Sequence, residues 1–308
     1  MAALAKKQEA TAARLDGLTV PASGQWASEA RAAALGRLRE MGLPDRRDEY
    51  WKYTRPDTLT QADAPAAAVF DTGEPPLFDS FDRIKVVFVD GVFDAEQSDE
   101  LAGEGLTIER LADVAEKDIH WAKELYGVLE AKGQTPVERP LAAFNTAFAT
   151  DGVVIHVTGK VAKPVSLIYQ HKAESSDAVL HHVIKLDAGA EVTVLENGPA
   201  AARFNKSMEV NVADNAAFHH VRAQGRDHER RAVTHLFGRL GTESVFKSFT
   251  LTVNGRLTRN EAVLELTGDD AVAHVAGGCL GGCGFHHDEP GFCPQEERDP
   301  SHQQTMHR

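Results

Sequence analysis

The chain has 308 residues, of which 42% are hydrophobic, and it carries a formal net charge of −13 at neutral pH. This length and apolar content suffice for one large domain or two ordinary ones, which argues against a disordered chain. The acidic balance argues against nucleic acid as a partner, because affinity for phosphates depends mainly on lysine and arginine.

The N-terminal segment and the cysteines indicate the compartment. Charged side chains are scattered through the Ala-rich helical pattern of the first 20 residues, at Lys6, Lys7, Glu9, Arg14 and Asp16. They interrupt the apolar run that a signal peptide needs, and no stretch is long enough to span a bilayer. All three cysteines fall within the last thirty residues, which is no disulfide framework. We therefore expect a cytoplasmic protein without membrane contact.

The first half of the chain predicts helices mixed with a strand. A helix over residues 29–41 has Ser23 or Ser28 as its N-cap and ends before Gly42 and Pro44. Further segments are predicted as a strand and turn over 84–93 and as helices over 108–117, 120–132 and 140–149. The helical period gives way to a period of two near residues 146–152, so we expect an N-terminal mixed domain over residues 1–150.

The second half predicts one strand after another. Turn residues recur about every ten to twelve positions and separate strand-like segments at 152–158, 165–170, 178–186, 190–196, 207–212, 216–222, 232–237, 245–253, 261–266 and 271–275. Most of these segments alternate apolar with polar residues, as half-buried strands do. Short strands without intervening helices suit a sandwich, a barrel or a β-solenoid, and spacing alone leaves these alternatives open.

Carboxylates on the strands raise the possibility of a β-helix enzyme that acts on carbohydrates, which would need two of them for acid/base work. The candidates are Glu191, Glu196, Glu209 and Glu261. Strand alternation scatters them over both faces, so we interpret them as solvated surface carboxylates. The sequence has no G-x-x-x-x-G-K-[ST] loop and no recognisable nucleophile motif. We expect no catalytic residues.

Histidines occur as two adjacent pairs, His181–His182 and His219–His220. Adjacent strand residues point to opposite faces, so neither pair can chelate one metal ion. A metal site would need pairing across rungs, for instance of His219 with His235, which the sequence leaves open. We interpret the lone strand histidines as partly buried residues: His156, His171 and His235.

The C-terminal segment has the residue types of a zinc or iron–sulfur site in Cys279, Cys283, His286 and Cys293. Their spacing, C-x3-C-x2-H-H-x5-C, fits no common site, and the glycines between them raise the entropy cost of closing one. Metal binding there stays an open hypothesis, which keeps an independent Cys/His metal-binding β protein as an alternative function.

Three segments resemble the SufB/SufD family of iron–sulfur cluster assembly scaffold proteins, in its SufD-like form. They are 42–54 with its Trp-Lys-Tyr-Thr element, 140–156, and 255–268 with an Arg-Asn-Glu turn. The resemblance implies a mainly β fold, a right-handed parallel β-helix over 151–277 behind the N-terminal helical domain. It also implies a non-catalytic scaffold subunit that acts with SufB and the SufC ATPase, with a cysteine desulfurase system as a further partner. An iron–sulfur cluster would then be held only transiently, at the level of the complex, and no cofactor would be bound firmly.

The first of these segments contains Trp51, Lys52 and Tyr53. We favour Trp51 and Tyr53 as an aromatic staple for the N-terminal helices, because aromatic residues near a Pro-rich loop anchor it by burying a large apolar area. The alternative is a contact surface for SufB, SufC or the desulfurase.

The resemblance weakens at the end of the chain. Residues 285–288 still resemble the family, whereas 289–308 are polar and interrupted by proline, without strand periodicity. The later rungs, the C-terminal helices and a Cys-Ser-His-Gly-Ala-type segment of the family have no counterpart. We expect that 278–308 form an aberrant tail, that residues after Asp288 come from a frameshift or premature stop, and that this chain binds SufC poorly.

Overall fold

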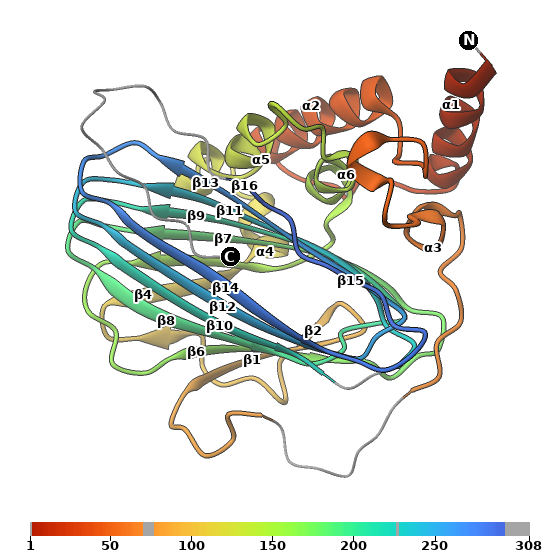
Figure 1. The fold of residues 1–308 in the computed structure, drawn as a ribbon. Helices are drawn as coiled ribbons and strands as arrows, with labels where there is room; N and C mark the ends of the chain where they lie inside the picture. Colours follow the sequence, from red (N-terminus) through yellow and green to blue (C-terminus); the bar gives the residue numbers. More distant parts are fainter. Residues whose placement is uncertain (1, 70–76, 226–227, 293–308) are drawn as a thin grey trace.

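The strand-rich part of the chain folds as a parallel β-solenoid, preceded by a helical region (Figure 1). The computed structural model describes residues 2–69, 77–225 and 228–292. The prediction of a mainly β fold with an N-terminal helical and mixed region is therefore confirmed, and the solenoid is selected over the sandwich and the barrel.

The elements follow one another in two blocks. The helices are α1 (Ala2–Leu15), α2 (Gln25–Met41), η1 (Glu49–Trp51), α3 (Asp57–Thr60), α4 (Leu111–Ala115), η2 (Trp121–Glu124), α5 (Val128–Lys132) and α6 (Pro140–Phe148). The strands before α6 are β1 (Ile84–Val89), β2 (Val92–Asp94), β3 (Ala102–Gly103) and β4 (Leu106–Arg110). The strands after it are β5 (Val153–Val157), β6 (Val165–Gln170), β7 (Asp177–Leu186), β8 (Glu191–Asn197), β9 (Arg203–Val212), β10 (Ala217–Gln224), β11 (Arg231–Leu240), β12 (Val245–Val253), β13 (Leu257–Leu266), β14 (Val272–Leu280), β15 (His287–Asp288) and β16 (Gly291–Phe292).

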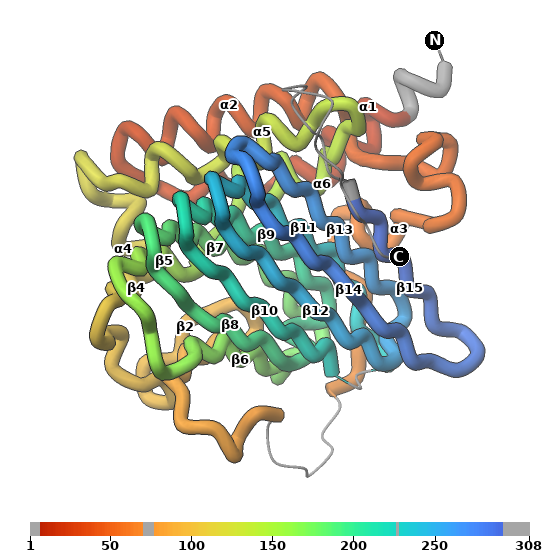
Figure 2. The backbone as a smooth tube through the Cα atoms, turned by 60° about the vertical axis from the view of Figure 1, so that its left-hand side comes forward, coloured from red at the N-terminus to blue at the C-terminus, as the bar shows by residue number. Residues whose placement is uncertain are grey.

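Two sheets face each other across the interior of the solenoid. Sheet A has the order β14-β12-β10-β8-β6-β1-β2, and sheet B has the order β15-β13-β11-β9-β7-β5-β4-β3, with β16 also on β13. From β5 to β15 successive strands alternate between the sheets, and each pairs in parallel with the strand two places away. Figure 2 shows these rungs following one another along the stack from green to blue.

One half of the solenoid interior is apolar. There, residues that pair with one another on successive strands are all apolar, so they stack from rung to rung. Val192, Phe218 and Phe246 are neighbours on β8, β10 and β12, and all three are fully buried. Burying a side chain of this size stabilises the fold by about 1.5–3 kcal/mol. The stack of like residues holds successive rungs in one register.

The helices cover the outer face of sheet B (Figure 1). Trp26 and Leu38 of α2 and Phe144 of α6 share one buried cluster with Val183 and Phe237, which project outward from β7 and β11. This second core fixes the helical region to the solenoid.

The N-terminal half departs from the prediction at three places. Helix α2 begins at Gln25 with Gly24 as its N-cap, so the expected Ser23 or Ser28 cap is wrong, and the hydroxyl of Ser28 instead donates to the carbonyl of Ser23. The predicted helix over 108–117 begins only at Leu111, because Ile108 belongs to β4 and pairs with Ile155 in sheet B.

The predicted helix over 120–132 is two short helices, because Gly127 between them adopts a φ of +73°. The predicted Arg-Asn-Glu turn at 259–261 is also wrong. Arg259, Asn260 and Glu261 lie inside β13, where they pair with three consecutive residues of β11.

The division of the chain at residues 150 and 277 stays a prediction. Helix α6 ends at Phe148 and β5 begins at Val153, close to the expected change of pattern. However, β1 pairs with β6 and β4 pairs with β5, so strands from before residue 150 complete the first rungs. At the other end, β14 continues to Leu280.

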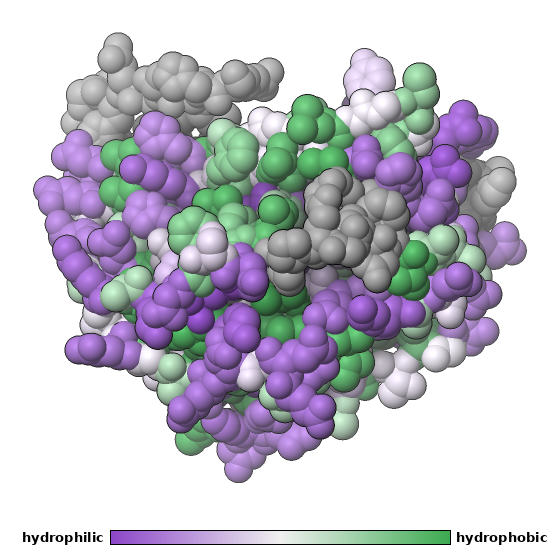
Figure 3. Space-filling model, turned by 90° about the horizontal axis from the view of Figure 1, so that it is seen from below, coloured by the Kyte–Doolittle hydropathy of each residue, from purple (hydrophilic) through white to green (hydrophobic). Residues whose placement is uncertain are grey.

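The described surface mixes apolar and polar side chains. The face seen from below carries hydrophobic side chains in its middle with hydrophilic ones around them (Figure 3). The exposed large apolar side chains include Tyr53, Val92 and Ile119. Within the described ranges, no helix combines the length and the hydropathy needed to cross a membrane.

Candidate functional site: a polar network inside the solenoid

One half of the solenoid interior is polar, where the strands of sheet A end and those of sheet B begin. We call this set the interior polar network: Tyr169, His182, Glu196, Lys206, His220, Arg222, Gln224, Thr234, Ser248, Thr252 and Asn260. Every member is buried. Buried polar groups in such number are expensive unless each is paired, so their arrangement is the main candidate for a site.

Glu196 is the centre of the network. Its carboxylate accepts hydrogen bonds from Lys206 Nζ at 2.6 and 2.7 Å, from His220 Nε2 at 2.8 Å and from the hydroxyl of Tyr169 at 3.2 Å. Lys206 reaches it from β9 of sheet B, whereas His220 comes from the neighbouring strand of sheet A. The ion pair therefore ties the two sheets together across the interior.

The electrostatics of this cluster follow from burial and from close pairing. Burial alone would raise the pKa of Glu196, but Lys206 and the hydrogen bond from His220 hold it well below its usual range. Burial lowers the pKa of Lys206 to about 8, although Glu196 opposes the change. At neutral pH the pair is an ammonium and a carboxylate, buried among the other polar side chains of the network.

His182 extends the cluster toward the first rungs. Its Nδ1 accepts from the backbone N–H of Val153 at 3.1 Å, so the neutral ring carries its proton on Nε2, which lies 2.9 Å from the hydroxyl of Tyr169. Burial, reinforced by the charge of Lys206, lowers the pKa of His182 to about 3. His182, Tyr169 and Glu196 thus form a relay with one direction of donation.

The network continues toward the last described rung. Arg222 donates to Thr234 at 2.8 Å, and Thr234 donates to Asn260 at 2.8 Å. Asn260 exchanges two hydrogen bonds with Gln224 and lies 3.3 Å from Glu289. Beyond these residues, Glu289 accepts from the thiol of Cys279, and its charge together with burial raises the pKa of that thiol to about 12.

The four candidate glutamates prove to be a mixed set, and the interpretation of all four as solvated carboxylates is wrong. Glu191 is partly exposed, but Glu196, Glu209 and Glu261 are buried. The burial of these three depends on donors that strand alternation does not identify, whether these lie on other segments or two residues away on the same strand. Glu261, for example, accepts from Arg139 at 2.9 Å and from Arg259 at 2.6 Å.

The buried glutamates do not form the pair that glycoside hydrolysis needs. Glu196 points into the interior and bonds Lys206, whereas Glu209 lies under the helices and bonds His181 at 2.7 Å. Each of these two carboxylates is engaged by its own donors, so they are not a facing pair with room for a sugar between them.

The adjacent histidines divide between environments, as strand alternation predicts. His181 bonds Glu209 beneath the helices, whereas His182 faces the interior. His220 is buried against Glu196, and His219 lies 3.5 Å from Glu191 at the surface.

The suggested pairing of His219 with His235 is wrong. His219 lies at the outer surface of sheet A, whereas His235 is buried on the outward side of sheet B, stacked with Phe237. The lone histidines vary in burial: His235 and His171 are buried, and His156 is partly exposed and bonds Asp187 at 2.9 Å.

The C-terminal Cys/His set is not brought together by the described rungs. Cys279 bonds Glu289, Cys283 is exposed, and His286 bonds Thr54 at 2.9 Å. Cys293 lies outside the described residues. No group of three His, Cys, Asp or Glu side chains with metal-binding geometry occurs in the described part of the chain.

The prediction that Trp51 and Tyr53 anchor the N-terminal helices holds for Trp51 and is wrong for Tyr53. Trp51 is buried and stacks under the guanidinium of Arg259, with 4.1 Å between the guanidinium carbon and the ring centroid. Tyr53 is 82% exposed, so it anchors nothing. Thr54 completes the attachment by donating to Asp288 at 2.6 Å. The segment after α2 is therefore fixed to the last described rung.

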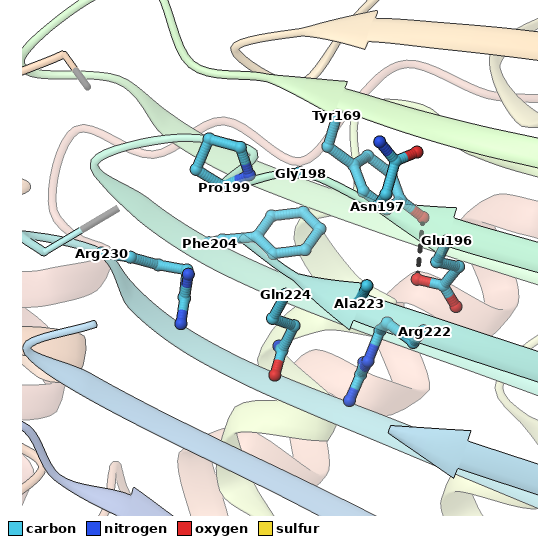
Figure 4. A pocket seen from close by; sticks show the side chains of 10 residues that line it. All are labelled: Tyr169, Glu196, Asn197, Gly198, Pro199, Phe204, Arg222, Ala223, Gln224 and Arg230. Carbon is cyan, nitrogen blue, oxygen red and sulfur yellow. Dashed lines mark hydrogen bonds between the residues drawn. The ribbon is translucent and has the colours of Figure 1, made fainter. Parts of the chain in front are cut away.

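The geometry of the polar half shows a narrow cavity beside the network (Figure 4). It is lined by Tyr169, Glu196, Asn197, Gly198, Pro199, Phe204, Arg222, Ala223, Gln224 and Arg230. The space for the centre of a water-sized molecule is about 10 Å³, enough for one such species. The site can therefore hold a very small ligand or water but no organic substrate.

Comparisons with known proteins agree with the fold. Residues 78–167 match the family model described as the SufBD protein N-terminal region, and residues 169–298 match the SUF system FeS cluster assembly, SufBD core domain. The iron-sulfur cluster assembly protein SufD of Escherichia coli (strain K12) is 24% identical over 259 residues, which are 78% of this chain and 56% of that relative. The chain thus spans little more than half the length of this relative.

The core match covers the whole interior polar network, from Tyr169 to Asn260. It also continues ten residues beyond Asp288, and β16 pairs with β13 at Gly291–Phe292. The expectation that resemblance and strand pattern both stop at Asp288 is therefore wrong. Sequence reasoning missed Lys206 and Arg222, although Lys206 stands two residues from both Phe204 and Met208 on one face of its strand, which was a usable signal.

Proposed function

The chain belongs to the SufB/SufD family of the SUF system of iron–sulfur cluster assembly, and we propose that it acts there as a SufD-like scaffold subunit. In this proposal the protein is cytoplasmic and non-catalytic, and it works in a complex with a SufB-like protein and a SufC-like ATPase. A cysteine desulfurase system is a further partner, and a cluster is present only transiently, as the cargo of the complex.

The observation that carries the proposal is an open sheet edge at the last described rung. Among the described strands, β14 has β12 as its single neighbour. Its amide at Val272 donates to Ser244, and its carbonyl at Leu280 accepts from Asn254, so the even-numbered residues of β14 face β12. In a parallel ladder the odd-numbered residues then point their backbone groups away from the sheet. Such an edge accepts a strand from a partner of the same architecture.

Apolar side chains accompany this edge. Val272, Val275 and Leu280 of β14 and Phe249 of β12 are between 40% and 59% exposed. Exposed apolar residues beside an unpaired strand favour a protein partner over solvent. The nearly complete pairing inside the network, in contrast, favours a rigid scaffold over a catalytic pocket.

Affinity purification of the tagged chain, co-expressed with SufB-like and SufC-like proteins, tests the proposal. We expect the SufB-like protein to be retained in a fixed ratio. Val275→Pro removes an outward amide of the edge without breaking a bond to β12, and Leu280→Lys places a charge beside it. Both variants should reduce retention at least about tenfold, as a loss of about 1.4 kcal/mol or more predicts.

Ile119→Lys is the matched control, because Ile119 is an 84% exposed apolar residue in the region between α4 and η2. It should retain the partner as the parent chain does. If the parent chain retains neither protein, or if the two edge variants bind as well as the control, the proposed assembly is refuted.

A further inference from the structure

Arg222 is a buried cation with few partners. It projects from β10 into the polar half of the interior, and its Nη1 donates to the hydroxyl of Thr234 at 2.8 Å. Its Nε is buried and has no hydrogen-bond partner among the described residues. Since a buried guanidinium is normally paired with a carboxylate, this arrangement leaves both a charge and a donor unsatisfied.

The nearest carboxylate of the network forms no direct ion pair with Arg222 and is shared with Lys206. Glu196 is its direct neighbour in the parallel register of β8 and β10. Both oxygens of Glu196 are occupied by Lys206, and His220 and Tyr169 add further donors. No carboxylate oxygen of the described residues lies within ion-pair distance of Arg222. Glu196 therefore attracts Arg222 without a hydrogen bond, and Glu289 adds a weaker attraction.

The same guanidinium lines the narrow cavity described above. Figure 4 shows the side chains of Arg222 and Gln224 on one side of the cavity and the hydrogen-bonded Tyr169–Glu196 pair on another, with the ring of Phe204 between them and Arg230. The wall is mostly apolar, and its two buried polar atoms without a partner among the described residues are the donor Nε of Arg222 and the acceptor Oδ1 of Asn197.

We propose that this cavity binds one small monovalent inorganic anion, of the size of chloride, through Arg222. A monatomic anion neutralises the guanidinium and accepts from its Nε, and it needs little more room than the one water-sized species that the cavity admits. A phosphate or a carboxylate ligand is too large for this space. Burial lowers the pKa of Arg222 from its ordinary value, which agrees with a cation short of counter-charge.

The site is separate from the β14 edge and does not depend on a partner. Its consequence is local: the anion closes the gap between Arg222 and the rest of the interior polar network, so the network becomes fully paired when the anion is bound. Anion binding would then stabilise the folded chain in proportion to the anion's concentration.

Two measurements on the isolated full chain test the site, with bromide and chloride as probes. Crystals grown in sodium bromide should show an anomalous bromide peak within hydrogen-bond distance of Arg222 Nε. Thermal unfolding in sodium chloride should occur about 3 °C or more above unfolding in sodium gluconate of equal ionic strength, because gluconate cannot enter the cavity.

Arg222→Met should abolish the peak and the difference between the two salts. Arg239→Met is the matched control, since Arg239 pairs with Glu265 at the surface of the same solenoid, and it should keep both effects. If Arg222→Met does not fold, Phe204→Trp provides the second test, because Phe204 projects into the interior beside the cavity, so a larger ring there fills the cavity while the guanidinium is retained. Water alone in the parent cavity, or a bromide peak that survives in Arg222→Met or Phe204→Trp, overturns the proposal.

Discussion

Lys206 and Glu196 face each other across the interior of the solenoid, with Nζ 2.6 Å from Oε1 and 2.7 Å from Oε2. Both side chains are about 1% exposed, and they belong to opposite sheets. A buried pair of this kind need not add net stability, since desolvation offsets its attraction. It does, however, destabilise any alternative fold in which β8 and β9 do not bring Glu196 and Lys206 together.

Removing one partner of this pair should be far more damaging than removing both. Lys206→Met or Glu196→Gln alone leaves a buried group unpaired, and each should lower the free energy of unfolding by about 3–5 kcal/mol. The double variant should recover part of that loss, with a coupling energy of about 0.5–3 kcal/mol. Urea denaturation of the four proteins measures these values.

Lys132→Met is the control for this cycle, because its pair with Glu265 leaves the lysine side chain 55% exposed. It should lower the free energy of unfolding by no more than about 1 kcal/mol. Single network variants that cost as little as this control would contradict the account of the pair.

Glu209 should hold the helical region onto sheet B. Its carboxylate accepts from the backbone amides of Gly127, Leu129 and Glu130 at the start of α5, and also from His181. Glu209→Gln removes the charge from these hydrogen bonds and should lower the free energy of unfolding by about 2 kcal/mol. Hydrogen exchange at the three amides should accelerate more than exchange in β7 or β9.

Glu265→Gln serves as the comparison for Glu209, because Glu265 joins β13 to Lys132 at the surface. It should leave exchange at the start of α5 unchanged. Equal protection of those amides in both variants would mean that Glu209 does not anchor the helix.

The strands could be predicted because apolar and polar residues alternate within most of the segments. Val245–Val253 has the bounds that the sequence predicts, and its burial alternates residue by residue. The helix over 108–117 was predicted wrongly, because Ile108 obtains its partner from β5, more than forty residues away. Local pattern cannot reveal a pairing of that range.

The interior polar network could not be predicted from the sequence for a related reason. Lys206 and Glu196 are ten residues apart on strands of different sheets, so their contact depends on how each rung turns between the sheets. Alternation shows that Lys206 shares a face with buried apolar residues, but it does not identify the carboxylate opposite. The glutamates were therefore interpreted as solvated when three of the four are buried.

Acid should weaken the fold through His182. Its pKa is lowered to about 3 in the folded chain, whereas an unfolded histidine titrates near about 6.5. Between these values the unfolded chain binds more protons, so the free energy of unfolding falls as the pH falls, by up to about 1.4 kcal/mol per pH unit from this group. His182→Gln should reduce that slope in urea denaturation measured from pH 7 down to about pH 4.

Val194→Ala is the control for the acid experiment, because it loosens the same interior without removing a titrating group. It should lower the free energy of unfolding by about the same amount, near 2 kcal/mol, at every pH. A His182→Gln slope that matches that of Val194→Ala would show that His182 is not held neutral.

Gly198 should tolerate no side chain, because the backbone of Tyr169, a member of the interior polar network, lies against it. It follows Glu196 and Asn197 with a φ of +113°, and an added Cβ would overlap the backbone carbonyl of Tyr169. Gly198→Ala therefore displaces the strand that carries Tyr169, and it should lower the free energy of unfolding by about 3 kcal/mol. Gly36→Ala, in the exposed interior of α2 with open space around it, should instead raise that free energy by about 0.5–1 kcal/mol. Urea denaturation measures the free energy of unfolding of both variants. If both variants change it in the same direction, the close approach of the Tyr169 backbone is not what requires glycine at position 198.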